Sequence, residues 1–309
     1  MSPFPRVDVV VPTRDRPEML RTAITAILAS EYKGDIRVLV VYDQSSPDSS
    51  LATEQSLGIG DHRSVSVLSN NRTPGLAGAR NTGLLTADAE LVGFCDDDDT
   101  WLPHKLAAQV DALAAEPDAE FVCCGIEVLY DGESHPRVLD LRHVTLTDLV
   151  RDRLTELHPS TFLMRRAAVV EGFGLVEEEI PGSFGEDYEL LLRAARRHAI
   201  LNVPEVGVQV LWSSRSYFTA RWQTMRSGLT WLLERYPEFE DVPAGEARIA
   251  GQIAFAAAAD KDRKQGARWA WRALRRRPVE PRAYLALAVA GGLSPQWVLR
   301  RLHSVGRGI

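Results

Sequence analysis

The sequence predicts an α/β protein in which a mostly parallel sheet is flanked by helices, followed by an all-helical C-terminal extension. Three observations support this fold class. Short apolar runs alternate with segments of helical spacing over the first hundred residues, which is the pattern of a parallel sheet with helices on both faces. The alternation loosens after Pro103 into an α+β pattern. Only helical spacing remains from Tyr217 onward.

The first half, about residues 1–103, contains the alternating elements. Residues 7–11 form a short apolar run and predict a buried strand. Residues 17–30 place apolar side chains at spacings of three and four, with Pro17 in the first turn, and predict a helix. By the same criteria we expect a strand at 36–41, a short helix at 51–57, a strand at 65–68, a helix at 76–87 and a strand at 91–95.

The second half, about residues 104–220, mixes helices with strands that are close in sequence. We expect a helix at 104–115, a strand at 120–130, a hairpin partner near 137–141 and a helix at 186–197. We place a domain boundary near residue 220. The prediction is thus a sheet domain over 1–220 and a helical C-terminal region over 221–309.

Charge is distributed unevenly along the chain. The net charge is -6, yet residues 261–309 hold 12 Lys and Arg against 2 Asp and Glu, a balance of +10. Residues 1–260 hold 24 and 40, a balance of -16. A basic tail on an acidic body suits anionic lipid headgroups, nucleic acid, or an acidic face of the body or of a partner.

The cysteines and the N-terminus bear on the compartment. Cys95, Cys123 and Cys124 have neither disulfide nor zinc spacing, which favours reduced, buried thiols and a cytoplasmic location. Residues 1–6 lack the charged and apolar regions of a signal peptide. No stretch approaches the roughly 18 apolar residues that span a bilayer, so we expect neither classical export nor membrane integration.

Four consecutive carboxylates, residues 96–99, follow the apolar run 91–95. Adjacent like charges repel, and the cost is tolerable in free water or beside a metal ion or basic groups. The run is therefore either a solvated acidic turn or part of a cation site. In parallel sheets ligands lie beyond the carboxyl ends of the strands, where Pro12, Thr13, Asp43 and residues 70–71 also fall.

Five stretches, taken in order, resemble the family 2 glycosyltransferases, which are inverting enzymes with the GT-A fold. They are residues 9–16, 40–46, 71–84, 95–103 and 185–190, and the resemblance covers about residues 7–215. It implies a nucleotide-sugar donor and a hydroxyl-bearing glycan or lipid-linked acceptor. Beyond residue 220 it implies little.

The resemblance assigns Pro12, Thr13, Arg14 and Asp43 to the donor nucleotide pocket. A carboxylate such as Asp43 can accept a hydrogen bond from the imide N–H of uracil or thymine, so UDP or dTDP is the favoured donor nucleotide. Where many relatives have Asp-Asp-Gly-Ser, this chain has Tyr-Asp-Gln-Ser at residues 42–45, which alters the expected base or ribose contacts.

Arg80 is expected near the donor, where a guanidinium pairs with phosphate, or else in an exposed ion pair with Asp88 or another acid.

The metal-binding D-x-D motif of the glycosyltransferase family that this chain resembles aligns with residues 96–98. Because four aspartates follow one another, this alignment can shift by one residue. By this alignment Asp98 is the direct ligand of Mn²⁺ or Mg²⁺, and Asp96 and Asp97 contact ribose or bound water. The remaining ligands would be diphosphate oxygens and water. Asp99 is expected to be the most replaceable of the four for ion binding.

Asp187, in the pair Glu186-Asp187, is the general base that the resemblance implies. The alternative is that both acids merely favour the positive end of a helix dipole. The glycine-rich segment 181–185 before them is expected to close over the donor. The other acceptor or loop candidates are Trp101, His158, Ser160, Glu186 and Arg215, the last in a stretch where many relatives carry a histidine.

The resulting hypothesis is an inverting, metal-dependent transferase. The alternative is a nucleotide-sugar-binding or scaffold protein without turnover, and a retained base at Asp187 favours the enzyme. A nucleotidyltransferase would want an early glycine-rich phosphate loop, which residues 11–14 lack. We expect a cytoplasmic protein and no nucleic-acid partner. The basic tail, with Trp269, Trp271 and Trp297, either binds the anionic inner face of the membrane or packs on the body of the protein.

Overall fold

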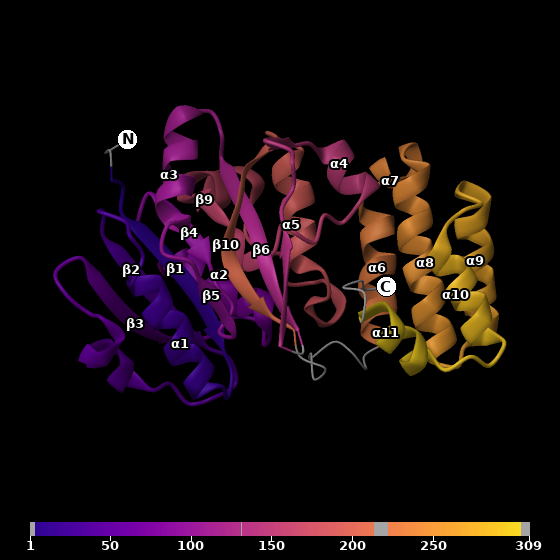
Figure 1. Cartoon of the computed structure of the whole chain (residues 1–309), viewed down its shortest axis with the longest axis horizontal. Coiled ribbons are helices and arrows are strands. Elements are labelled where there is room, and N and C mark those ends of the chain that lie inside the picture. Colours follow the sequence, from indigo (N-terminus) through magenta and orange to yellow (C-terminus); the bar gives the residue numbers. More distant parts are fainter. Residues whose placement is uncertain (1–3, 131, 213–221, 304–309) are drawn as a thin grey trace. The chain divides into compact units, whose positions relative to one another are not determined.

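The computed structural model describes residues 4–130, 132–212 and 222–303. The chain divides into two compact units, which are taken separately. The sheet unit comprises residues 1–146, 154–178 and 186–213, and the helical unit comprises residues 147–153, 179–185 and 214–309. Figure 1 labels their elements along the chain.

The sheet unit is built on one mixed sheet, as the α/β prediction requires. Its strand order is β3-β2-β1-β4-β9-β6-β10-β5, with β7 beside β6 and β8 beside β10. The strands are β1 (Val7–Thr13), β2 (Ile36–Tyr42), β3 (Arg63–Ser69), β4 (Leu91–Phe94), β5 (Asp99–Trp101), β6 (Phe121–Tyr130), β7 (Glu133–Arg137), β8 (His143–Val144), β9 (Leu163–Arg165) and β10 (Ile200–Leu211).

Parallel pairing of the first four strands brings their carboxyl ends to one edge. Thr13 pairs with Tyr42 and Val10 with Phe94, so β1, β2 and β4 end close together. Beyond β4 the directions mix, because β9 runs antiparallel to both β4 and β6 while β10 runs parallel to β6. The edge after β1, β2 and β4 is where the acidic run and Asp43 leave the sheet.

Helices cover both faces of the sheet, and the alternation of β1 shows how. Val7, Val9 and Val11 belong to a buried cluster that includes side chains of α1 (Pro17–Leu28) and α3 (Lys105–Ala115). Val10 points to the other face, against Gly83 of α2 (Leu76–Thr86). Since successive strand residues face opposite sides, α2 lies on the face opposite to α1 and α3.

The described structure agrees with most elements expected for the first half. The segment 51–57 differs, since it forms two 3₁₀ helices, η1 (Ser49–Thr53) and η2 (Gln55–Leu57). The hairpin partner of β6 begins earlier than residue 137, because the chain turns at Gly132, whose φ is 82°. All three cysteines are buried and free, as expected.

One long strand, β10, went unpredicted for a physical reason. Its sequence carries Pro204 and Gly207, which normally mark the end of a strand. The structure accommodates both at irregularities, since the pairing register with β6 shifts between Val203 and Val206 and again before Val208.

The helical unit packs small side chains closely. Its central cluster includes Ala250, Ala254, Ala270, Ala273 and Ala286, and alanine lets helices approach one another without large side chains. Among the described residues, no helix is long and apolar enough to cross a membrane. The helices are α6 (Trp222–Arg235), α7 (Glu238–Asp241), α8 (Pro243–Ala259), α9 (Arg263–Arg276), α10 (Pro281–Ala290) and α11 (Pro295–His303), with most of α4 (Leu146–Arg151).

The contact between α2 and β1 gives a test of the fold. A Cβ at Gly83 would lie 2.3 Å from a methyl carbon of Val10, so Gly83→Ala overpacks the sheet face. Overpacking costs about 1–3 kcal/mol and outweighs the roughly 1 kcal/mol that Ala gains over Gly inside a helix. We expect a lower urea midpoint for unfolding. Gly60→Ala is the control, because nothing lies within 4 Å of its Cβ position; equal midpoints for the two variants would contradict the packing.

Candidate functional site

The acidic run lies in the connection between β4 and β5, where the chain leaves one strand and enters another. Asp97 is 6% exposed and Asp99 2% exposed, so the run is not a solvated turn. That alternative from the sequence is wrong. Each of the four carboxylates has a polar or cationic partner from a segment far away in sequence.

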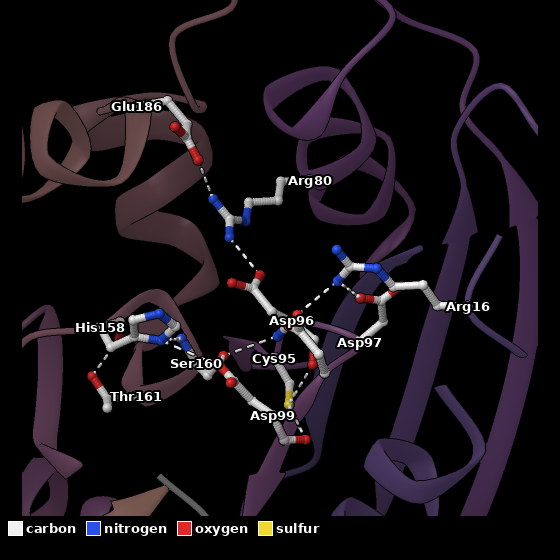
Figure 2. Close-up of polar contacts among 11 residues, drawn as sticks. Arg16, Arg80, Cys95, Asp96, Asp97, Asp99, His158, Ser160, Thr161 and Glu186 are labelled. Atoms are coloured by element: carbon white, nitrogen blue, oxygen red, sulfur yellow. Dashed lines mark hydrogen bonds and ion pairs between the residues drawn. The ribbon is translucent and has the colours of Figure 1, made fainter. Parts of the chain in front are cut away.

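Arg80 is the buried cation of the site. Its guanidinium lies between two carboxylates, with Nη2 donating to Asp96 Oδ1 at 2.7 Å and Nη1 donating to Glu186 (Figure 2). The side chain is 1% exposed, and its Cζ lies 5.4 Å from the centre of the Phe94 ring. Because α2 carries Arg80 and α5 (Glu186–Ala195) carries Glu186, this group joins two helices to the end of β4.

These contacts revise the expectations for Arg80. The exposed ion pair with Asp88 is wrong, because Asp88 pairs with Arg6 and Arg37 instead. Both terminal nitrogens of Arg80 donate to carboxylates, and its expected pairing with a donor phosphate stays a prediction.

Arg16 is a second cation of the site, in addition to the residues expected from the sequence. It directly precedes α1 and donates from Nη1 to Asp97 Oδ1 at 3.1 Å and to Asp98 Oδ2 at 2.7 Å. Thr13 Oγ1 donates to the other oxygen of Asp97 at 2.7 Å. The position of Arg16 in the sequence could have indicated this role, because a basic residue just beyond β1 lies at the same sheet edge as the acidic run.

Burial raises the pKa of Asp97 above its ordinary value, although the hydrogen bond from Thr13 and the charge of Arg16 oppose the rise. Burial, together with the negative charge of Asp96, raises the pKa of Asp98 to about 6, against the opposing charge of Arg16. The two carboxylates therefore hold protons more readily than exposed ones do. Any cation that binds them must compete with both a proton and Arg16.

Asp99, Ser160 and His158 form the other side of the site. Ser160 donates from Oγ to Asp99 Oδ2 and accepts from the backbone N–H of Asp96 at 2.9 Å. His158 Nδ1 lies 3.3 Å from Asp99 Oδ2. Burial and the charge of Asp96 raise the pKa of Asp99 well above its ordinary value. Ser160 thus ties the two ends of the acidic run to η3 (Pro159–Thr161).

This donor set fits a divalent cation. One ligand atom from each of Asp96, Asp99 and His158 lies within 4.8 Å of the others. Carboxylate oxygens suit Mg²⁺ and Mn²⁺, and an imidazole nitrogen is also acceptable to Mn²⁺. Asp98, expected as the direct ligand, is outside this trio and pairs with Arg16, with 31% of its side chain exposed.

The expected nucleotide residues surround the ends of β1 and β2. Asp43 is 8% exposed and accepts from Asn70 Nδ2 and Gln44 Nε2, each at 2.8 Å, and from Gly75 N at 3.1 Å. Burial raises the pKa of Asp43, but these hydrogen bonds outweigh it and leave that pKa below its ordinary value. Gln44, the departure from the usual motif, therefore has a role in fixing the carboxylate. Pro12 and Thr13 are buried, and Arg14 is exposed.

The acids at the start of α5 differ in environment. Glu186 is 4% exposed, and burial raises its pKa to about 7 in spite of the neighbouring charge of Arg80. Asp187 is only partly buried and lies in the same first turn.

Two further residues expected on the acceptor side are Trp101 and Arg215. Trp101 is 2% exposed, with Lys105 Nζ 3.6 Å from the centre of its ring, and its acceptor or loop role stays a prediction. Arg215 lies outside the described residues.

Comparison with protein families gives a match over more than half of the chain. The model described as glycosyl transferase family 2 matches residues 8–173. A GalNAc(5)-diNAcBac-PP-undecaprenol beta-1,3-glucosyltransferase of Campylobacter jejuni is 37% identical over 104 residues, which is 34% of this chain and 33% of that protein. A pre-mycofactocin glycosyltransferase of Mycobacterium tuberculosis is 27% identical, over 65% of this chain and 42% of that protein. These matches thus span a third to less than half of those relatives' lengths.

Solved structures share the fold. Staphylococcus aureus TarS, residues 1–349 in complex with UDP-GlcNAc, aligns with a TM-score of 0.61 at 16% identity, covering 98% of this chain and 92% of that one. The Pyrobaculum calidifontis mannosyltransferase PcManGT, in complex with GDP-Man and Mn²⁺, aligns with a TM-score of 0.60 at 20% identity, covering 97% and 80%. The expected GT-A architecture is confirmed.

The raised pKa of Glu186 predicts a pH dependence of stability. Between its ordinary value of 4.5 and about 7, the folded state keeps a proton that the unfolded state has lost. Stability contributed at this position therefore falls as pH rises through that window. Glu186→Gln still accepts a hydrogen bond from Arg80 but cannot ionise, so the variant gains stability relative to the parent as pH rises from 4.5 to 7.

Denaturant unfolding of parent and variant across this range measures the effect. Glu18→Gln, at an exposed position in the first turn of α1, is the matched control and should follow the parent at every pH. Parallel pH profiles for the parent and Glu186→Gln would show that the carboxyl is not perturbed in this way.

Proposed function

The chain belongs to glycosyl transferase family 2, and on that premise we propose that it transfers a sugar from a nucleotide-diphosphate donor to a hydroxyl acceptor with inversion. The observation that carries this proposal is the link through Arg80, which holds the start of α5 against the acidic run after β4. We propose that the two sets of carboxylates joined by this link have separate tasks, one set serving the leaving group and the other the attacking hydroxyl.

For the donor, we propose that Pro12, Thr13, Arg14 and Asp43 receive the nucleoside, with UDP or dTDP favoured. The amide-rich surroundings of Asp43 support this role, since its carboxylate is held ionised and fixed in direction. Within the acidic run, Asp96 and Asp97 are proposed to contact the ribose or bound water.

For the metal, Asp98 remains the proposed ligand of Mn²⁺ or Mg²⁺, and the geometry adds Asp96, Asp99 and His158 as candidates. A bound dication would supply positive charge for the diphosphate leaving group. Arg80 and Arg16 already partly neutralise these acids, which keeps the carboxylates close enough together to bind a cation.

Asp187 is the proposed general base. Its carboxylate accepts the proton of the acceptor hydroxyl while that oxygen attacks the anomeric carbon opposite the leaving group. The bond from the anomeric carbon to the diphosphate oxygen breaks, and the single displacement inverts the centre. The ion pair of Arg80 with Glu186 fixes the first turn of α5, which supports a positioning role for both residues; the donor contact of Arg80 and the acceptor contact of Glu186 stay part of the proposal.

The acceptor side is proposed to lie in residues 104–220, after a donor half at 1–103. Ser160, His158 and Arg215 are the acceptor or loop candidates, and the helical region 221–309 is an addition to this domain. The acceptor is a glycan or a lipid-linked hydroxyl compound. We propose the cytoplasm as the compartment, with transfer at the inner face of the membrane for a lipid-linked acceptor.

The alternative is a protein that binds a nucleotide sugar without turnover. Such a protein needs donor contacts but no base. The partly exposed Asp187, beside a buried and separately partnered Glu186, favours the enzyme.

The base assignment predicts that Asp187→Asn lowers the transfer rate by about 10²- to 10⁴-fold, the usual contribution of a positioned base. Donor affinity should stay near that of the parent, because the variant keeps the shape of the side chain. Release of the nucleoside diphosphate in the presence of acceptor measures the rate, and calorimetry measures donor binding. Asp111→Asn, exposed on α3, is the control. Full activity in the Asp187 variant would refute the assignment.

A thermal-shift panel of UDP-, dTDP-, GDP- and CMP-sugars, with and without Mn²⁺, tests the donor and the metal. At a ligand concentration of 100 times Kd, binding stabilises the folded state by about 2.7 kcal/mol. We expect the largest rise in Tm for a uridine or thymidine donor with Mn²⁺.

Asp98→Asn should lose the Mn²⁺-dependent part of that rise, while Asp61→Asn, at an exposed position outside the acidic run, should keep it. No metal-dependent stabilisation by any of the four sugars would count against the catalytic proposal itself.

A further inference from the structure

Helix α9 carries a row of cations around an exposed tryptophan. Lys264, Arg268, Trp271 and Arg275 follow one another at spacings of four, three and four, and side chains at these spacings share one face of a helix. All four are exposed, and Trp271 is 64% exposed. We call this row the α9 stripe. The opposite face packs into the helical unit through Gly266, Ala270 and Ala273.

Three acids packed near α9 form ion pairs with arginines that are not part of the α9 stripe. Glu246 pairs with Arg272 and Arg276, and Glu280 pairs with Arg277 and Arg282. Asp262 pairs with Arg226 and accepts from the backbone N–H of Gln265 at the start of α9. Within the described part of the chain, Lys264, Arg268 and Arg275 have no carboxylate within ion-pair distance.

This arrangement has a cost in water that a partner would relieve. Three unpaired cations on one narrow face repel each other, and the indole of Trp271 exposes apolar surface between them. A tryptophan has an apolar body and a polar N–H, which suits the boundary between lipid headgroups and acyl chains. Lysine and arginine beside it match anionic headgroups.

We propose that the α9 stripe docks on the surface of an anionic phospholipid bilayer, with Trp271 entering the headgroup layer. The helix would lie on the surface, because no helix among the described residues is long and apolar enough to cross a membrane. The net charge of +10 over residues 261–309 adds a longer-range attraction to the anionic surface.

The shape of the stripe favours a bilayer over a nucleic acid. Proteins that bind single strands combine a basic groove with several aromatic side chains that stack on successive bases. The α9 stripe has one exposed aromatic side chain on the outside of a helix. The flat surface of a bilayer, in contrast, can contact the α9 stripe along the whole length of the helix.

Co-sedimentation of the 309-residue chain with vesicles tests the proposal. We expect binding to vesicles of equal parts phosphatidylglycerol and phosphatidylcholine, weak binding to phosphatidylcholine alone, and loss of binding as salt screens the charges. Replacing Lys264, Arg268 and Arg275 together by Gln should weaken binding on the order of 100-fold, at about fivefold per cation. Trp271→Ala should also weaken it, with partial recovery in Trp271→Phe.

The matched control replaces Lys33, Arg151 and Arg235 by Gln, which removes the same charge from exposed positions outside α9. It should bind like the parent. Equal binding to anionic and neutral vesicles, parental binding by the stripe variant, or tighter binding of single-stranded RNA through the same three residues would each overturn the proposal. The inference does not rest on the proposed reaction, because the vesicle assay contains no sugar donor and measures only binding to lipid. A Tm equal to that of the parent, measured without ligand, shows that the stripe variant is folded.

Discussion

The buried guanidinium of Arg80 is the interaction on which the site depends. Without a cation at this point, the carboxylates of Asp96 and Glu186 would face each other in a region closed to water. Burying an arginine and two acids carries a large desolvation cost, and such groups are often no more stabilising than apolar residues would be. What the arrangement provides is geometry. It sets α2, the end of β4 and the start of α5 at fixed distances, although Arg80 and Glu186 are 106 residues apart in sequence.

The sheet makes this convergence possible. Parallel pairing of β1, β2 and β4 ends three strands at one edge, so Thr13, Asp43 and the acidic run leave the sheet close together. The return of the chain through β5, antiparallel to β10, then turns Asp99 inward toward Ser160. The four consecutive aspartates thus occupy four different environments, and sequence proximity alone says little about which of them binds an ion.

Local patterns were enough to predict most elements of the first half of the fold, although not β5 or the two 3₁₀ helices. The apolar runs of β1 to β4 are short and continuous, and the helices between them keep their spacing. β10 was missed because Pro204 and Gly207 interrupt it, and pairing with β6, β5 and β8 keeps it extended. The candidate site was predicted as a set of loops after strands. Its internal contacts were not, because the partners of Arg16, Arg80 and Asp99 come from distant segments that no local spacing relates.

The two arginines of the site differ in how freely they can leave their carboxylates. Arg16 keeps 41% of its side chain exposed, so water can replace Asp97 and Asp98 as its partner at little cost. Arg80 is 1% exposed, and moving it would leave a buried charge without compensation. A cation bound by Asp98 therefore competes with Arg16, whereas one bound by Asp96, Asp99 and His158 shares Asp96 with Arg80. The acids on the Arg16 side can change partners, while the link from Asp96 to α5 stays in place, which keeps Asp187 fixed whether or not a cation is bound.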